Sequence, residues 1–120
     1  MREHPDGAQL LAIAREVLRK ELLPLLPKDK AYDALMIANA MGIAERQLQQ
    51  GDVPQQQEKA GLSVLLDSQQ DLAGLNREFA QGIRRGDFDE NAQARELLWE
   101  ATLQRVRESA PKALSAYKLK

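Results

Sequence analysis

The segment from Ala34 to Ala44 constrains the fold most strongly, because every side chain in it except that of Asn39 is apolar or absent. A helix that is apolar around its whole circumference is typical of a central helix covered by neighbours. Elsewhere no alternation of β-branched or aromatic residues persists, and the abundant Leu, Ala, Gln, Glu and Arg are good helix formers. The sequence therefore predicts an all-α fold with this segment at its centre.

Capping residues and helix breakers divide the chain into five predicted helices. We expect these helices over about 6–23, 29–50, 54–66, 71–85 and 89–109. Asp6 with Gln9 predicts a capping box, Asp29 and Asp52 are candidate caps, and Gly51 and Gly86 mark helix ends. Gly61 lies inside the third helix, where glycine costs roughly 1 kcal/mol relative to alanine.

Short connections between successive helices favour antiparallel neighbours. The prediction is an up-and-down bundle of four to five helices. A chain of 120 residues is long enough to bury one core, so we expect a single helical domain over 1–120. The basic segment at about 111–120 is expected to form a loosely held tail.

The bulk properties argue against several classes of protein. The net charge of −1 and the lack of a basic helical face argue against nucleic acid as a partner. Because the chain has no cysteine, disulfides, thiolate zinc sites and cysteine nucleophiles are excluded. No segment approaches the roughly 20 apolar residues of a membrane span, and the start does not resemble a signal peptide. A cytoplasmic protein without membrane partners is expected.

Residues that could support enzyme chemistry are scarce. His4, the only histidine, lies in an N-terminal segment that is expected to be mobile. The stretch "DFDEN" starts like a calcium loop, but Ala92 and Leu98 stand where glycine and a bidentate glutamate belong. It is predicted to be a polar turn before a helix cap. Glu96 and Glu100 share a helical face, which we interpret as a solvated surface. The sequence predicts no enzyme, no metal site and no cofactor.

Two asparagines lie where apolar residues are expected. Asn39 shares a helical face with Met36 and Ile43, so it is predicted to point inward. Asn76 lies between Leu75 and Phe79 near the apolar stripe of its own helix. An unpaired buried amide costs a few kcal/mol, so both asparagines should have hydrogen-bond partners.

Two interpretations of this pair remain open. In the favoured, structural one, the two amides bond to backbone or to each other and fix which helices pack together. In the functional one, they line a small pocket with Arg46 or Arg77 at its mouth. Trp99, the only tryptophan, adds a further candidate: burial in the core is expected, whereas exposure would indicate an anchor for a protein interface.

Four segments resemble a small all-helical bacterial family of unknown function: "LLAIAREVLRKELLPLLP", "ANAMGIAERQLQQG", "LNREFAQGIRRGDFD" and "TLQRVRESAPK". The run of Asn39, Glu45 and Arg46 and the Leu75–Asn76 pair followed by "IRRGDFD" carry the resemblance. Members of that family tend to be encoded beside aminoglycoside-phosphotransferase-like kinases and acyl-CoA dehydrogenases. The chain itself lacks the phosphate loop, the catalytic loop and the lysine-bearing strand of a kinase.

The resemblance implies a non-enzymatic accessory protein that binds a phosphotransferase-like kinase. An apolar patch around Trp99, the "LLPLLP" corner or the third helix is expected to make the contact. The alternative is a domain that binds a small molecule, an acyl or phosphorylated metabolite, around Asn39 and Asn76. A third interpretation is self-association as a homodimer that covers helices too apolar for water.

Overall fold

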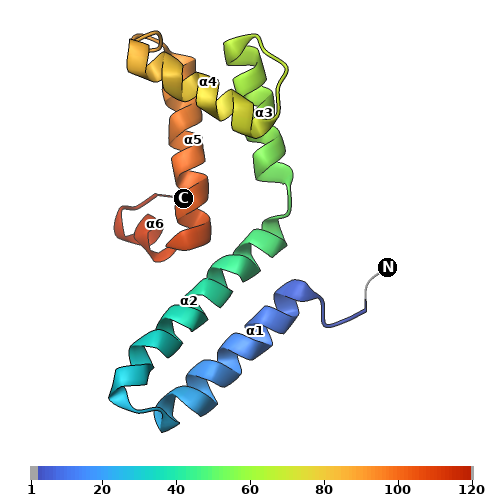
Figure 1. The fold of residues 1–120 in the computed structure, drawn as a ribbon, viewed down its shortest axis with the longest axis vertical. Helices are drawn as coiled ribbons and strands as arrows, with labels where there is room; N and C mark the ends of the chain where they lie inside the picture. Colours follow the sequence, from blue (N-terminus) through green and yellow to red (C-terminus); the bar gives the residue numbers. More distant parts are fainter. Residues whose placement is uncertain (1–2, 120) are drawn as a thin grey trace. The chain divides into compact units, whose positions relative to one another are not determined.

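The computed structural model describes residues 3–119, and it confirms the all-α prediction because these residues form helices and turns without any strand. The chain divides into two compact units, residues 1–51 and 52–120, which are drawn together in Figure 1. Within each unit, short connections join helices that pack against one another. The prediction of one helical domain over 1–120 stays a prediction, since two compact units can belong to one domain or to two.

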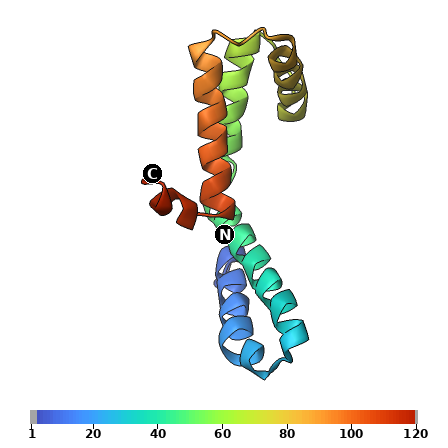
Figure 2. The same cartoon turned by 90° about the vertical axis from the view of Figure 1, so that its left-hand side faces the viewer.

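The first unit is a helical hairpin. Helix α1 (Gly7–Val17) continues through a π-helical turn (Leu18–Leu22) and a 3₁₀ turn (Leu23–Leu25), and α2 covers Lys28–Gln50. The two helices lie side by side in both views (Figures 1 and 2). The connection falls at the "LLPLLP" corner, where proline has no N–H to continue a helix.

The predicted capping box at the start of α1 is confirmed. The Gln9 amide nitrogen donates to Asp6 Oδ1 at 2.9 Å, and the Asp6 amide nitrogen donates to Gln9 Oε1 at 2.8 Å. Farther along the surface, the hydrogen bond and the charge of Lys20 lower the pKa of Glu16. Both side chains of this second pair are exposed, so it contributes little to stability.

The start of α2 differs from the prediction. Pro27 occupies the N-cap position and Asp29 lies inside the first turn, so the prediction that Asp29 caps this helix was wrong. A carboxylate in the first turn still interacts favourably with the exposed N–H groups and the helix dipole. The end at Gly51 is confirmed: its φ of 64° lies in the left-handed region that glycine adopts without strain.

The contact between α1 and α2 is made by small residues. Ala34, Ala38 and Gly42 are the buried residues of α2, spaced four apart on one face. Arg15 of α1 crosses this face, and its Nε donates to the Ala38 carbonyl oxygen at 3.0 Å. The other sides of α2 carry exposed apolar residues. The expectation that neighbouring helices cover α2 all round was therefore wrong for the residues described.

The second unit contains α3 (Val53–Leu66), α4 (Leu72–Arg85), α5 (Ala92–Ser109) and the short α6 (Lys112–Ala116). Helix α3 packs against α4 and against α5, and Figure 2 shows α3 and α5 running side by side. A short helix thus occupies the segment predicted to be a loose tail, and it packs on α5. The core cluster of this unit consists of buried Leu62, Leu75, Phe79 and Ala94 with half-buried neighbours that include Leu97 and Phe88.

Gly61 has a packing role inside α3. A Cβ added there would lie 2.5 Å from Cδ2 of Leu97 on α5, closer than two non-bonded carbon atoms can approach. The absence of a side chain therefore lets α5 lie close to α3. The helix-propensity cost of Gly61 is offset by the contact with Leu97.

The ends of α4 and α5 are set by polar caps and a glycine. Asp71 Oδ1 accepts from the Gly74 amide nitrogen at 2.8 Å, and α4 ends at Gly86 with φ 82°, as predicted. The cap of α5 is Asn91, whose Oδ1 accepts from the Ala94 amide nitrogen at 2.9 Å. The prediction that α5 begins near Asp89 was wrong, because residues 86–90 form the turn between the helices.

We expect Asp71→Ala to lower the free energy of unfolding by about 1 kcal/mol, because the substitution removes the acceptor for a first-turn amide. The matched control is Asp52→Ala, since Asp52 holds the same position before α3 without a side-chain hydrogen bond. Urea denaturation followed by circular dichroism measures both. Equal losses for the two variants would contradict the assignment of the cap to the Asp71 carboxylate.

Candidate functional site

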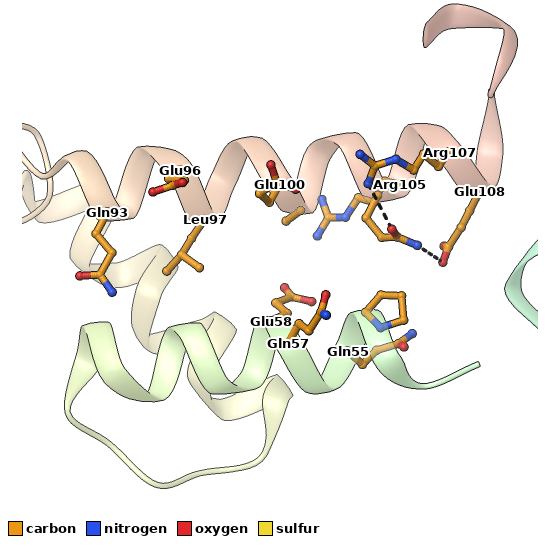
Figure 3. A pocket seen from close by; sticks show the side chains of 13 residues that line it. Gln55, Gln57, Glu58, Gln93, Glu96, Leu97, Glu100, Arg105, Arg107 and Glu108 are labelled. Atoms are coloured by element: carbon orange, nitrogen blue, oxygen red, sulfur yellow. Dashed lines mark hydrogen bonds between the residues drawn. The ribbon is translucent and has the colours of Figure 1, made fainter. Parts of the chain in front are cut away.

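A cavity of about 560 Å³ lies between α3 and α5, and Figure 3 shows its lining from close by. We call it the α3–α5 cavity. Helix α3 contributes four residues near its N-terminus and α5 contributes the rest. The lining residues are Pro54, Gln55, Gln57, Glu58, Gln93, Glu96, Leu97, Glu100, Ala101, Gln104, Arg105, Arg107 and Glu108.

The lining of the α3–α5 cavity is polar and carries both signs of charge. Glu58 projects from α3, and Glu96 and Glu100 project from α5 (Figure 3). Towards the other end, Arg107 Nη1 donates to Gln104 Oε1 at 3.4 Å, and Gln104 Nε2 donates to Glu108 Oε1 at 3.0 Å. This arrangement can hydrogen-bond a polar molecule through carboxylate, amide and guanidinium groups.

A smaller cavity of about 70 Å³ adjoins the first one, and both are lined by Glu58, Leu97, Ala101 and Arg105. Apolar residues, among them Leu62 and Phe79, make up much of its lining. Asn76 of α4 also lines it. One of the predicted site residues thus borders a small pocket together with an arginine, although that arginine is Arg105 rather than Arg46 or Arg77.

Asn76 finds its hydrogen bond inside its own helix. Its Nδ2 donates to the Leu72 carbonyl oxygen at 3.1 Å, one turn earlier. The neighbouring Arg77 is exposed. The amide of Asn76 is therefore held in place by the backbone of α4, and the polar groups that line the larger cavity come from α3 and α5.

Asn39 does not point inward. The residue is exposed, because the face of α2 that contacts α1 passes through Ala38 and Gly42, and Asn39 is turned away from that face. The prediction that it is a buried amide was wrong. It also belongs to the first unit, whereas Asn76 belongs to the second.

Arg46 lies within the hairpin. It is half-buried, and its Nη1 would lie 3.4 Å from a Cβ added to Gly42, with Arg15 Nε at 3.3 Å from the same point. The glycine therefore leaves room for two arginine side chains over α2. Arg46 packs in the hairpin and does not line the small pocket that Asn76 borders.

Trp99 is half exposed, with 51% of its surface accessible, and Leu98 beside it is 44% exposed. The expectation of a core tryptophan was wrong. One turn farther along α5, Leu103 is buried, so the helix is anchored by a smaller aliphatic residue while the tryptophan projects towards solvent. Exposure is the outcome that the sequence associated with an interface anchor.

The sequence interpretation did not find the α3–α5 cavity. It placed Glu96 and Glu100 on one face but interpreted that face as ordinary solvated surface. The available signal was the recurrence of polar residues at spacings of three and four along α5, which keeps them on one side of the helix. These residues are Gln93, Glu96, Glu100, Gln104 and Arg107.

The "DFDEN" stretch is a polar turn before a helix cap, as predicted. Asp87 pairs with Arg85 at 3.0 Å, and Phe88 packs against Phe79 with 5.2 Å between ring centroids. Across residues 3–119 no three His, Cys, Asp or Glu side chains are grouped so that they could hold a metal ion. Within the same residues, no helix has both the length and the apolar character needed to cross a membrane.

These observations define an all-α protein with a small-residue hairpin, a three-helix core and a polar cavity between two of its helices. The model of a family described as a domain of unknown function (DUF6285) matches residues 24–113, three quarters of the chain. The chain belongs to this family. The resemblance to a family of unknown function is confirmed to that extent, and the neighbouring genes stay a prediction. Comparison with curated proteins and with solved structures gave no match.

Proposed function

We propose that this chain is a non-enzymatic accessory protein that binds another protein through the surface of α5 around Trp99. The observation that carries the proposal is the exposure of this residue. Tryptophan combines a large apolar area with one N–H donor, and it is enriched among the residues that dominate binding energy at interfaces. Burial of an exposed tryptophan against a partner removes apolar surface from water and so lowers the free energy.

The packing of α5, the helix that carries Trp99, suits such a contact. Helix α5 is fixed on α3 by Leu97 and Gly61 and is held in the core through Ala94 and Leu103. Trp99 and Leu98 therefore project from a helix that needs little reordering on binding. Preorganisation of this kind reduces the conformational entropy that association costs.

The resemblance described above suggests the first partner to test. Members of the family that the sequence resembles tend to be encoded beside phosphotransferase-like kinases, so we propose a kinase of that class as the partner. In this role the chain would stabilise or regulate the kinase without taking part in phosphoryl transfer. An acyl-CoA dehydrogenase of the kind that tends to be encoded beside members of that family is the second partner to test.

We expect Trp99→Ala to weaken binding to the kinase-like protein at least tenfold, because the largest exposed apolar group of α5 is lost. The chain should be co-expressed with the kinase-like protein encoded beside a family member, and the affinity should be measured by calorimetry. Tyr117→Ala is the matched control, since it removes an exposed aromatic residue that lies outside α5. Binding that is equally strong in wild type and Trp99→Ala would contradict the proposed surface.

A second candidate function is supported by the two adjoining cavities of the second unit. Asn76 and Arg105 line the smaller one together with apolar residues, and Arg105 and Arg107 line the larger one. An arginine together with apolar lining residues suits an acyl or phosphorylated metabolite. A thermal-shift screen of such compounds with wild type and Arg105→Ala would test this function. Stabilisation of the wild type alone would support it.

A further inference from the structure

The hairpin of the first unit lacks a core of its own. Among its described residues, 3–51, the buried ones are Ala34, Ala38 and Gly42, so no side chain larger than a methyl group is buried. The second unit, by contrast, buries leucine and phenylalanine side chains. The rest of the contact comes from half-buried side chains, among them Leu11, Leu18 and Ile43, and from Arg15 and Arg46. The hairpin therefore buries little apolar surface for an independent unit.

The apolar residues that could form such a core lie on the surface of the hairpin. On α2 the consecutive residues Leu35, Met36 and Ile37 are 41–51% exposed. Because successive residues of a helix point 100° apart, these three present apolar surface to more than one side of α2. A helix of this kind has neighbours on several sides, and α1 supplies only one of them.

Helix α1 carries a second exposed stripe. Leu10, Ile13, Ala14 and Val17 recur at spacings of three and four and are all exposed. The stripe is symmetric along the chain, because Leu10 and Val17 lie equally far from the midpoint between Ile13 and Ala14. An antiparallel pair of such helices related by a two-fold axis would place Leu10 against Val17 and Ile13 against Ala14 of the other copy.

We propose that a second copy of this chain covers the hairpin, with the α1 stripes crossing antiparallel at a two-fold axis. Two hairpins would then form a four-helix bundle. The exposed apolar residues of the hairpin offer an area on the order of 1,000 Å² over all its sides, so a partner that covered most of it would reach the roughly 800 Å² buried per partner in a standard interface. They come from eleven residues: Leu10, Ile13, Val17, Leu22, Leu25, Leu26, Tyr32, Leu35, Met36, Ile37 and Leu48.

A second copy fits this surface for chemical reasons as well as for its area. The α1 stripe is uncharged and aliphatic, so its best complement is another aliphatic surface of the same length. The symmetric spacing makes the stripe complementary to itself, as an isologous contact requires. This inference goes beyond the proposed function, because it concerns the first unit, whereas Trp99 lies in the second.

The first test is the mass of the protein in solution. Light scattering at concentrations well above micromolar should give twice the mass of one chain for the wild type and the mass of one chain for Ile13→Glu. The control Val64→Glu places the same charge on an exposed apolar residue of the second unit and should remain a dimer. A wild-type mass of one chain, or a dimer that survives Ile13→Glu, would overturn the proposal.

The second test does not depend on a disruptive substitution. Because the chain has no cysteine, a single Ala14→Cys substitution next to the proposed axis should give a disulfide-linked dimer on mild oxidation. Val64→Cys, also exposed, is the control and should stay largely unlinked under the same conditions. Equal linking in the two variants would show random collision and would overturn the proposed axis. Selective linking of the Ala14→Cys variant would support it.

Discussion

Leu75→Ala should lower the free energy of unfolding of the second unit by about 3 kcal/mol, because the substitution removes a fully buried leucine side chain and leaves a cavity. Leu75 has no accessible surface and belongs to the core cluster with Leu62 and Phe79. Guanidinium denaturation, followed by circular dichroism, measures this loss. The control Val64→Ala truncates a side chain that is 73% exposed and should change stability by less than about 0.5 kcal/mol.

A loss below about 1 kcal/mol for Leu75→Ala would contradict the packing described for α3, α4 and α5. The result would mean that the second unit can rearrange to fill the space, or that its core lies elsewhere. Hydrogen exchange of the amides of α4 would distinguish these two explanations, since a tightly packed helix exchanges slowly and a rearranging one does not.

The second large effect is expected at Gly82. A Cβ at this position would overlap the ring of Phe88, which itself packs on Phe79. Alanine is the better helix former by about 1 kcal/mol, so propensity alone predicts that Gly82→Ala stabilises α4. We expect the overlap to dominate, with a net loss of about 2 kcal/mol in the free energy of unfolding.

A double-mutant cycle separates these two contributions. In a Phe88→Ala background the ring is absent, so Gly82→Ala should become neutral or slightly stabilising. Thermal or urea unfolding of the four proteins gives the coupling between the two positions. If Gly82→Ala costs the same in both backgrounds, the close approach of the turn to α4 is not what selects glycine.

The helices were predicted well from sequence because their ends are marked locally. The carboxylate of Asp6, the amide of Gln9 and the left-handed glycines at 51 and 86 act on backbone groups within one turn. Local chemistry of this kind is visible in the sequence. The errors at Asp29 and Asp89 have the same origin, since each lies within two residues of the true cap and either position looks suitable.

The positions of Asn39 and Trp99 could not be predicted because they depend on how many neighbours each helix has. The apolar segment around Asn39 predicts a helix covered by neighbours and so an inward-pointing amide, and the leucines before Trp99 predict a core tryptophan. In the structure α2 packs on the α1 side only within its unit, and α5 uses aliphatic residues for its core face. Periodicity reports which residues share a face, but it does not report whether another helix lies against it.

The α3–α5 cavity illustrates the same limit. Its polar lining has helical periodicity on α5, and that pattern is also typical of a solvated surface. The decisive fact is the close approach of α3 and α5 at Gly61, which brings Glu58 to the opposite side of the cavity. That approach depends on the contact between Gly61 and Leu97, two residues from separate helices.

The most direct test of the proposed function uses Trp99 itself, because it is the only tryptophan in the chain. In the free chain its emission should be that of a solvent-exposed indole and should be quenched readily by acrylamide. With 5-fluorotryptophan at position 99, the ¹⁹F signal should shift when the kinase-like partner is added, since the ring becomes buried in the contact. A shielded ring in the free chain, or an unchanged signal while the partner binds, would contradict an interface at Trp99.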